Sequence, residues 1–258
     1  MKGETTMIME DRLDAIEELT NEKGFVSTRE LAARFKVSEP TIRTDCRELE
    51  KRQRILRVHG GAKSRKARSI MTRKTESEMN SRTNKDTEQK DKLCAYAASL
   101  VEDDDCIFVD GGTTFTDLVG HLDGKKVRMV THSLIIPDTF SDKNGELFVA
   151  GGSYSPKYRM NLGPVALDDL ERFNFKYAFL SCAGIDVARG KAYTAEMETA
   201  EVKKKAMKLA EKSFLLVDES KKNIKGFCSF ADLDEFDGIV TFGSDDSDLP
   251  DNFILLEA

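Results

Sequence analysis

The sequence has no long apolar run and few residues suited to covalent or metal cross-links. No stretch of its 258 residues approaches the roughly 18 consecutive apolar residues that a membrane helix needs. Its five cysteines are scattered, odd in number and without a C-x-x-C pair, and its three histidines are widely spaced. This pattern favours reduced core thiols over a disulfide framework or a zinc site. We therefore expect no metal site.

The composition excludes further classes of protein. With 5 prolines, 17 glycines, 40% hydrophobic and 33% charged residues, the chain is neither collagen-like nor of low complexity. The beginning of the sequence carries charges throughout and lacks the apolar core of a signal peptide. We expect a cytoplasmic globular protein with either one large domain or a small domain and a medium one.

The net charge of −6 conceals a basic segment. Residues 1–74 contain 18 basic and 12 acidic residues, whereas the remainder contains 22 basic and 34 acidic residues. Residues 40–74 alone contain 12 basic and 3 acidic residues. A basic block beside an acidic body is typical of a segment that faces a polyanion, although a solvated basic surface would give the same counts.

The amino-terminal pattern predicts three short helices. Apolar residues recur at helical spacing over residues 10–23 and 31–35, and a capping box precedes the second helix at residues 27–30. Ser38 is placed to cap a third helix, with Pro40 in its first turn, where a missing N–H costs little. The apolar face of this third helix consists of Ile42, Cys46 and Leu49.

Two short helices joined by a tight turn, the second of them capped and basic, make a helix-turn-helix. Arg43 and Arg47 are one turn apart, so both can enter one groove, where arginine reads guanine or clamps phosphate. Residues 55–61 predict a short β-hairpin that ends in a glycine pair and forms a wing. A helical protein-interaction module is the alternative. The residues expected to contact DNA are Ser38, Pro40, Thr41, Arg43, Thr44, Arg47, Arg57, His59 and Gly60.

This segment resembles a known family. The run V-S-E-P-T-I-R-T-D at residues 37–45, followed by R-V-H-G-G-A at residues 57–62, resembles the signature of DeoR-type bacterial transcription regulators. Thr44 stands where that family usually has a second arginine, which bears on the bases that are read. Cys46 replaces a leucine, a conservative change in the core. The resemblance implies that residues 1–62 form a winged helix-turn-helix domain that binds double-stranded operator DNA.

Residues 63–88 contain few apolar residues and cannot build a core, so we expect a linker. Residues 89–258 then alternate between short apolar runs and helical patterns. Strands are predicted at residues 106–109, 127–130, 147–150, 177–180, 214–217, 238–241 and 253–256, and helices at 114–122, 134–142, 165–173 and 200–212. This alternation indicates an α/β domain with a mostly parallel, doubly wound, Rossmann-like sheet.

Polar residues collect where these strands end, which is where such sheets bind ligands. The first strand leads into D-G-G-T-T at residues 110–114, where glycines let backbone N–H groups approach a phosphate. We favour a small anionic ligand over a purely structural crevice, and we expect Lys221 to supply a compensating positive charge. The chain lacks a Walker A loop, a G-x-G-x-x-G motif after a strand and a G-x-S-x-G elbow, so we expect neither a nucleotide cofactor nor a hydrolase triad.

The same strand ends look like the DeoR-type sensor domain, which is similar to ribose-5-phosphate isomerase and glucosamine-6-phosphate deaminase. His132 stands where the family commonly has asparagine. The resemblance implies that residues 89–258 bind phosphorylated sugars or related metabolites. The residues expected to bind the effector are Asp110, Gly111, Gly112, Thr113, Thr114, Thr131, His132, Ser133, Gly151, Gly152, Gly184, Asp186, Glu198, Lys203, Asp218 and Lys221.

Two functions remain open from the residues. One is a DNA-binding regulator, a repressor of a carbohydrate operon that senses a phosphorylated sugar. The other is a sugar-phosphate isomerase or deaminase with an accessory nucleic-acid module. Carboxylates for acid–base catalysis are present, but the compact acidic loop of the related isomerases is reduced to Gly184-Ile185-Asp186. We therefore expect a regulator without a cofactor. We also expect a homodimer or homotetramer, because one small helix-turn-helix makes too few contacts for operator specificity.

Overall fold

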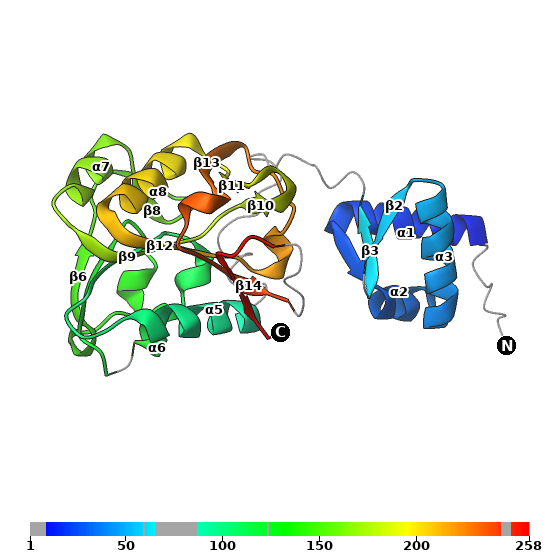
Figure 1. Cartoon of the computed structure of the whole chain (residues 1–258), viewed down its shortest axis with the longest axis horizontal. Helices are drawn as coiled ribbons and strands as arrows, with labels where there is room; N and C mark the ends of the chain where they lie inside the picture. Colours follow the sequence, from blue (N-terminus) through cyan, green and yellow to red (C-terminus); the bar gives the residue numbers. More distant parts are fainter. Residues whose placement is uncertain (1–8, 59, 65–86, 123, 244–248, 258) are drawn as a thin grey trace. The chain divides into compact units, whose positions relative to one another are not determined.

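The computed structural model describes residues 9–58, 60–64, 87–122, 124–243 and 249–257. The chain divides into two compact units, Met1–Ser69 and Ile70–Ala258, and each is described by itself (Figure 1). Across these described ranges, no helix is long and apolar enough to cross a membrane.

The first unit contains three helices and a small antiparallel sheet. The helices are α1 (Met9–Lys23), α2 (Thr28–Phe35) and α3 (Glu39–Lys51), and the strands are β1 (Phe25–Ser27), β2 (Ile55–Val58) and β3 (Gly61–Ser64), in the order β1-β3-β2. The three predicted helices and the predicted hairpin are confirmed, and β1 adds a third strand. The fully buried core includes Leu13, Ile16, Val26, Leu31, Ile42, Leu49, Ile55 and Ala62.

The caps of α2 and α3 follow the sequence signals. Ser27 accepts a hydrogen bond from the backbone N–H of Glu30 at 3.1 Å, and Ser38 accepts one from Thr41 at 3.3 Å. The first helix turn leaves such N–H groups without a backbone partner, so each serine side chain compensates one of them. Lys36 ends α2 in the left-handed conformation, with φ of 53°, and this makes the tight turn into α3.

The second unit is built on a parallel sheet of seven strands in the order β15-β14-β12-β9-β4-β5-β6. All seven predicted strands are confirmed. Their bounds are β4 (Cys106–Val109), β5 (Val127–Thr131), β6 (Gly145–Val149), β9 (Phe175–Leu180), β12 (Ala210–Leu216), β14 (Gly238–Phe242) and β15 (Phe253–Leu256).

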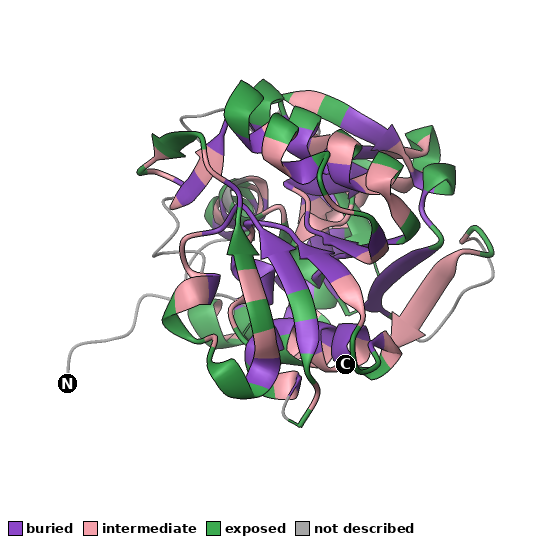
Figure 2. Cartoon of the chain, turned by 90° about the vertical axis from the view of Figure 1, so that its left-hand side faces the viewer, coloured by how far each residue is buried: buried purple, intermediate pink, exposed green. Residues whose placement is uncertain are grey.

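Helices cover both faces of this sheet, as expected for a doubly wound fold. One face carries α5 (Thr87–Leu100) and α6 (Leu118–His121), and the other carries α7 (Pro164–Leu170) and α8 (Met197–Leu209) (Figure 1). Two apolar cores result, one on each side of the sheet. Burial is complete along the interior strand β14 and partial along the edge strands β6 and β15 (Figure 2).

Two of the predicted helices are wrong or broken. Residues 134–142 form only two short 3-10 turns, Ile136–Asp138 and Asp142–Asn144, because Pro137 lacks the N–H that a helix interior requires. The helix predicted over residues 114–122 is a 3-10 turn, Thr113–Phe115, followed by the single turn of α6.

The helices predicted over residues 165–173 and 200–212 are confirmed as α7 and α8, with shifted ends.

The second unit also contains two small antiparallel sheets that the sequence pattern did not predict. One pairs β7 (Ser153–Ser155) with β8 (Met160–Leu162), and the other contains β10 (Gly184–Asp186), β11 (Lys191–Thr194) and β13 (Cys228–Asp232). Three further 3-10 turns are Val187–Arg189, Glu219–Lys221 and Leu233–Glu235.

Candidate functional site

The outer face of α3 carries the two arginines singled out in the sequence. Arg43 and Arg47 are exposed, one helical turn apart, while Ile42 and Cys46 lie in the core on the opposite side. Arg43 forms an exposed pair with Glu39 at 3.3 Å. Arg47 has no ion-pair partner within the part of the chain that the structure describes. The Arg47 guanidinium is therefore free to meet an anion in the solvent, whereas that of Arg43 is shared with an exposed carboxylate.

The remaining residues of the expected DNA-contacting set lie around the start of α3 and the wing. Ser38, Pro40 and Thr44 are exposed, and Thr41 is half-buried. The Thr44 hydroxyl donates to the backbone oxygen of Pro40 at 3.1 Å, so part of its hydrogen-bonding capacity is used inside the helix.

In the wing, Gly60 has a φ of 81°, and its backbone oxygen accepts hydrogen bonds from the N–H and hydroxyl of Thr28 at 2.7 and 3.0 Å. The left-handed φ explains a glycine at this turn. His59 lies outside the described residues.

Three arginines of the basic segment are held by carboxylates of the same unit. The pairs are Arg52 with Glu10 and Glu48, Arg54 with Asp14 and Glu17, and Arg57 with Glu50. Two of these arginines reach back to acidic residues of α1. The local charge count of residues 40–74 therefore overstates the positive charge that this unit offers to a polyanion.

A buried ion pair joins α1 to α3. The Arg12 side chain donates two hydrogen bonds to the Asp45 carboxylate, at 2.6 and 3.1 Å, and the two residues are 7% and 1% exposed. The hydrogen bonds to Asp45 raise the pKa of Arg12 above its usual value. Sequence reasoning used Asp45 only as part of a motif and did not identify Arg12. An aspartate on the apolar side of a helix was the available signal.

In the second unit, the polar residues Asp110, His132 and Ser181 each follow one of three neighbouring strands. Val109 of β4 pairs with Thr131 of β5 and with Phe179 of β9, so the residues that follow these strands converge. Asp110 is 1% exposed. Its carboxylate accepts a hydrogen bond from the backbone N–H of Ser181 at 3.0 Å and forms an ion pair with Lys203 of α8.

The Asp110 carboxylate is charged despite its burial. Burial is the largest single influence and would raise the pKa of Asp110, but the charge of Lys203 and the contact with His132 together outweigh it. The pKa of this carboxyl group therefore lies well below its usual range. Lys203 is itself only 4% exposed. Because each charge is buried, neither is stable without the other.

His132 is a buried part of the same cluster. Its Nδ1 lies 3.0 Å from the backbone oxygen of Asn161, and its Nε2 accepts a hydrogen bond from the backbone N–H of Gly111 at 3.0 Å. The same Nε2 also lies 3.2 Å from Oδ1 of Asp110. The ring also stacks on Phe108, with centroids 6.0 Å apart. The histidine therefore links the loop after β4, at Gly111, to Asn161 of β8.

A small cavity of about 40 Å³ lies beside this cluster. Its lining residues are Asp110, Gly112, Tyr158, Met160, Ser181, Cys182, Ala183, Thr194, Ala195, Glu196, Thr199 and Lys203. Pockets that enclose a small-molecule ligand commonly have about 300–1,000 Å³, so this cavity is small for a ligand site. Of the predicted effector residues, only Asp110, Gly112 and Lys203 line it.

The loop after β4 presents unused backbone donors. Among the described residues, no acceptor is found for the N–H groups of Gly112, Thr113 and Thr114, which precede or begin a 3-10 turn. A Cβ atom at Gly112 would lie 2.2 Å from Oγ of Ser181, the residue after β9, so close packing requires a glycine here. The sequence argument had assigned it to the approach of a phosphate alone.

Several other predicted effector residues shape loops through bonds of their own. The Thr131 hydroxyl donates to the backbone oxygen of Val109 at 2.6 Å, and the Ser133 hydroxyl accepts from the N–H of Ile135 at 3.2 Å. Gly151 donates its N–H to Asp169 at 2.8 Å. Gly152 is exposed with a φ of 120°, and Gly184 packs against the backbone of Ile224.

The charged residues of the predicted set are dispersed. Asp186 and Asp218 cap 3-10 turns by accepting backbone hydrogen bonds at 3.2 and 3.0 Å, and Glu198 is exposed. Lys221 is half-buried and lies close enough to Cys182 for its charge to lower the pKa of that thiol. Burial is the larger influence and raises the pKa of Cys182 to about 12. Lys221 is therefore near the cavity without lining it.

The structure adds a carboxylate and a phenol to the cavity. Glu196 is 8% exposed and accepts a hydrogen bond from the hydroxyl of Tyr158 at 3.0 Å. Neither Glu196 nor Tyr158 is among the residues that the sequence predicted to bind the effector. No cluster of three or more potential metal ligands is found in the ranges that the structure describes.

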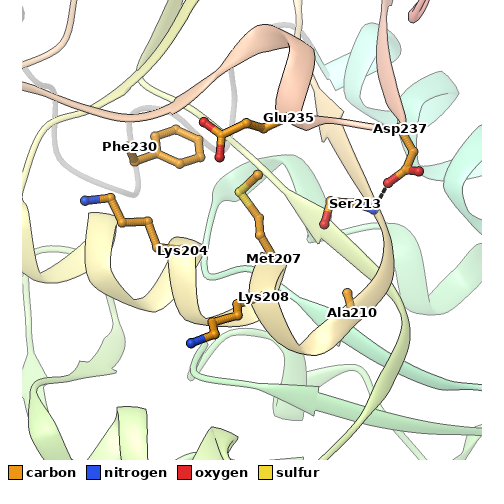
Figure 3. Close-up of a pocket in the computed structure, with 8 residues that line it drawn as sticks. All are labelled: Lys204, Met207, Lys208, Ala210, Ser213, Phe230, Glu235 and Asp237. Carbon is orange, nitrogen blue, oxygen red and sulfur yellow. Dashed lines mark hydrogen bonds between the residues drawn. The ribbon is translucent and has the colours of Figure 1, made fainter.

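A larger hollow, of about 340 Å³, lies at the opposite ends of the strands. Its lining residues are Lys204, Met207, Lys208, Ala210, Ser213, Phe230, Glu235 and Asp237 (Figure 3). Asp237 accepts a hydrogen bond from the backbone N–H of Ser213 at 2.8 Å. The lining of this hollow includes both positive and negative side chains, and none of its residues was predicted to bind an effector.

Comparison with known proteins identifies both units. Residues 12–68 match the DeoR-like helix-turn-helix domain, and residues 85–242 match the DeoR C terminal sensor domain.

Characterised relatives match over almost their whole length. The chain is 31% identical over 246 residues to a lactose phosphotransferase system repressor of Streptococcus mutans, covering 94% of the chain and 96% of the relative. It is 32% identical over 235 residues to the HTH-type transcriptional regulator IolR of Bacillus subtilis, with 89% and 90% covered. The HTH-type transcriptional repressor GlcR of Bacillus subtilis is 29% identical over 236 residues, with 91% and 89% covered.

The likeness to solved structures is weaker. Ribose 5-phosphate isomerase A of Neisseria gonorrhoeae gives a TM-score of 0.39 at 16% identity, covering 52% of this chain and 53% of the isomerase. The helix-turn-helix unit, the parallel-sheet unit and these matches lead to one conclusion: the chain belongs to the DeoR family of helix-turn-helix transcription regulators.

Proposed function

We propose that this protein is a repressor of a carbohydrate-use operon and that a phosphorylated sugar controls its binding to operator DNA. Residues 1–62 form the DNA-binding domain, 63–88 a linker and 89–258 the effector domain. Related proteins named as repressors, among them the lactose phosphotransferase system repressor of Streptococcus mutans, support this proposal. Because a regulator of operator DNA works where the DNA is, we propose a cytoplasmic location.

The DNA contacts proposed are those of α3 and the wing. Arg43 and Arg47 project from one exposed face, where a helix in the major groove meets base edges and phosphates. A single unit of this size makes few contacts. We therefore propose that the protein acts as a homodimer or homotetramer on a symmetric operator. Light scattering on the purified full chain measures the assembly directly.

The observation that carries the effector proposal is the loop after β4. Three backbone N–H groups, those of Gly112, Thr113 and Thr114, have no acceptor among the described residues, and they adjoin a cavity lined by the Lys203 ammonium. Backbone donors beside a lysine are the chemistry that binds a phosphate. A sugar ring would then meet the hydroxyl and carboxylate groups of the same cavity, such as those of Thr194 and Glu196.

The small volume of the cavity has a consequence for regulation. A sugar phosphate does not fit into about 40 Å³, so its binding requires the surrounding side chains to move. A ligand changes DNA affinity only if it binds two states of the protein unequally. We propose that the arrangement with Lys203 closed on Asp110 is the ligand-free state.

A thermal-shift panel tests the proposal. Phosphorylated pentoses, hexoses and hexosamines, their unphosphorylated forms and inorganic phosphate are each added to the full chain. A true effector at a hundred times its dissociation constant stabilises the protein by about 2.7 kcal/mol, and the matching sugar without phosphate does not. Lys204→Met removes the exposed lysine next to Lys203. It controls for the loss of a positive charge outside the cavity, and we expect it to respond to the effector like the wild type.

The same compounds are then tested for an effect on operator binding and for turnover. We expect a phosphorylated sugar to change operator affinity and none to be consumed. Isomerisation or deamination of any of them would instead favour the enzyme with an accessory nucleic-acid module.

A further inference from the structure

The Arg12–Asp45 pair occupies a particular place in the first unit. Asp45 lies two residues from Arg43 and two from Arg47, so on a helix it faces away from both of them. It points to α1, where the Arg12 guanidinium holds it through two hydrogen bonds, at 2.6 and 3.1 Å. The pair therefore sits directly behind the exposed arginine face of α3.

A buried ion pair of this kind is a poor source of stability. Removing two charges from water costs several kcal/mol per ion, and apolar residues of similar volume commonly serve as well or better. The surroundings here would suit such residues, because Leu13, Ile16, Ile42 and Leu49 are fully buried in the same core. Stability alone does not explain why two charges are kept in this position.

Geometry explains it better. Two N–H donors of a planar guanidinium fix a carboxylate in both distance and orientation, whereas apolar contacts tolerate sliding and rotation. Direct readout of bases requires side chains to be held within about 0.5 Å of their productive positions. A small rotation of α3 about its axis would move the tips of Arg43 and Arg47 by more than that.

We propose that Arg12 and Asp45 are positioning residues that set the rotation of α3 for operator recognition. This proposal rests on DNA binding through α3, as proposed above. It predicts that the pair contributes to discrimination between operator and random DNA more than to the stability of the fold.

The decisive variant replaces both charges at once. Arg12→Met combined with Asp45→Leu removes both charges of the pair together and replaces them with apolar side chains. We expect the melting temperature of the full chain to stay close to that of the wild type, while affinity for operator DNA falls about tenfold and affinity for random DNA changes by less than about threefold. Retention of the wild-type ratio between the two affinities would overturn the proposal. A substantially lower melting temperature would overturn it too, because the pair would then be a stabilising element.

Two further variants test whether the bidentate geometry of the guanidinium matters, beyond its charge. Arg12→Lys keeps the charge without the fork, so we expect part of the discrimination to be lost. Arg52→Gln removes an arginine that also pairs bidentately with α1, through Glu10, but on the exposed surface. This matched control should leave the operator-to-random ratio unchanged. Wild-type protein that itself fails to prefer any operator would refute the proposed function rather than the role of this pair.

Discussion

At the scale of single residues, Asp110 and Lys203 are the clearest case of mutual dependence. Asp110→Asn leaves the Lys203 ammonium buried without a counter-charge, and we expect it to lower the free energy of unfolding by about 3–5 kcal/mol at pH 7. Urea denaturation measures this. The exposed Asp138, which pairs with Arg159 at the surface, provides a control, since Asp138→Asn should have little effect.

The difference in unfolding free energy between the wild type and Asp110→Asn depends on pH, because the pKa of Asp110 is lowered in the folded protein. A carboxyl group whose pKa is lower in the folded state stabilises the fold fully above its pKa in the unfolded chain, about 3.9. This stabilisation is lost as the pH falls through the folded pKa. The gap between wild type and Asp110→Asn should therefore be constant near neutrality and shrink below about pH 4. A gap that widens in acid would contradict the charged pair.

Gly112 supports a second prediction at this scale. A Cβ atom there would collide with the Ser181 hydroxyl, which is bonded to Asp110. We expect Gly112→Ala to destabilise the protein by about 1–3 kcal/mol. Gly120 in α6 meets nothing within 4 Å, so Gly120→Ala should be neutral or stabilising by about 0.5–1 kcal/mol. Thermal melts of both variants check the pair, and equal effects would contradict the packing argument.

At the scale of elements, α1 determines which arginines of the basic segment are available to DNA. Arg54 is engaged by Asp14 and Glu17, whereas Arg47 projects freely from α3. Each phosphate contact adds about 0.9 to the slope of log affinity against log salt. We therefore expect Arg47→Ala to reduce this slope by about 1 and Arg54→Ala to leave it unchanged. Filter binding over a salt series measures both, and a reduced slope for Arg54→Ala would place that arginine on the DNA.

The elements also show which patterns can be interpreted locally. Continuous apolar runs predicted all seven strands of the parallel sheet, because strands covered on both faces need no polar side. The serine caps of α2 and α3 were equally local signals. The helix predicted over residues 134–142 does not form, because Pro137 interrupts its apolar periodicity. The strands of the small antiparallel sheets are too short to show a period.

At the scale of the whole molecule, the question is how effector and operator are linked. Lys221 is half-buried beside Cys182, which lines the cavity, and we expect Lys221→Ala to abolish the response to the phosphorylated sugar. Operator affinity without effector should stay the same, because α3 is untouched. The readouts are thermal stability and operator affinity with and without the sugar phosphate. A wild-type response would remove Lys221 from the site, and Lys212→Ala, on an exposed lysine of β12, is the matched control.

The sequence by itself determined the order of the two units, the seven parallel strands, the exposed arginine face of α3 and the family. Each of these depends on residues that are neighbours along the chain. Tertiary structure alone decided the charge relations. Arg12 and Asp45 are separated by 33 positions, and Asp110 and Lys203 by 93. No local pattern reports such pairs, because a carboxylate has the same letter whether it faces solvent, a ligand or a buried ammonium. Only packing decides which of these it meets, and with it which of the predicted residues remain free to bind.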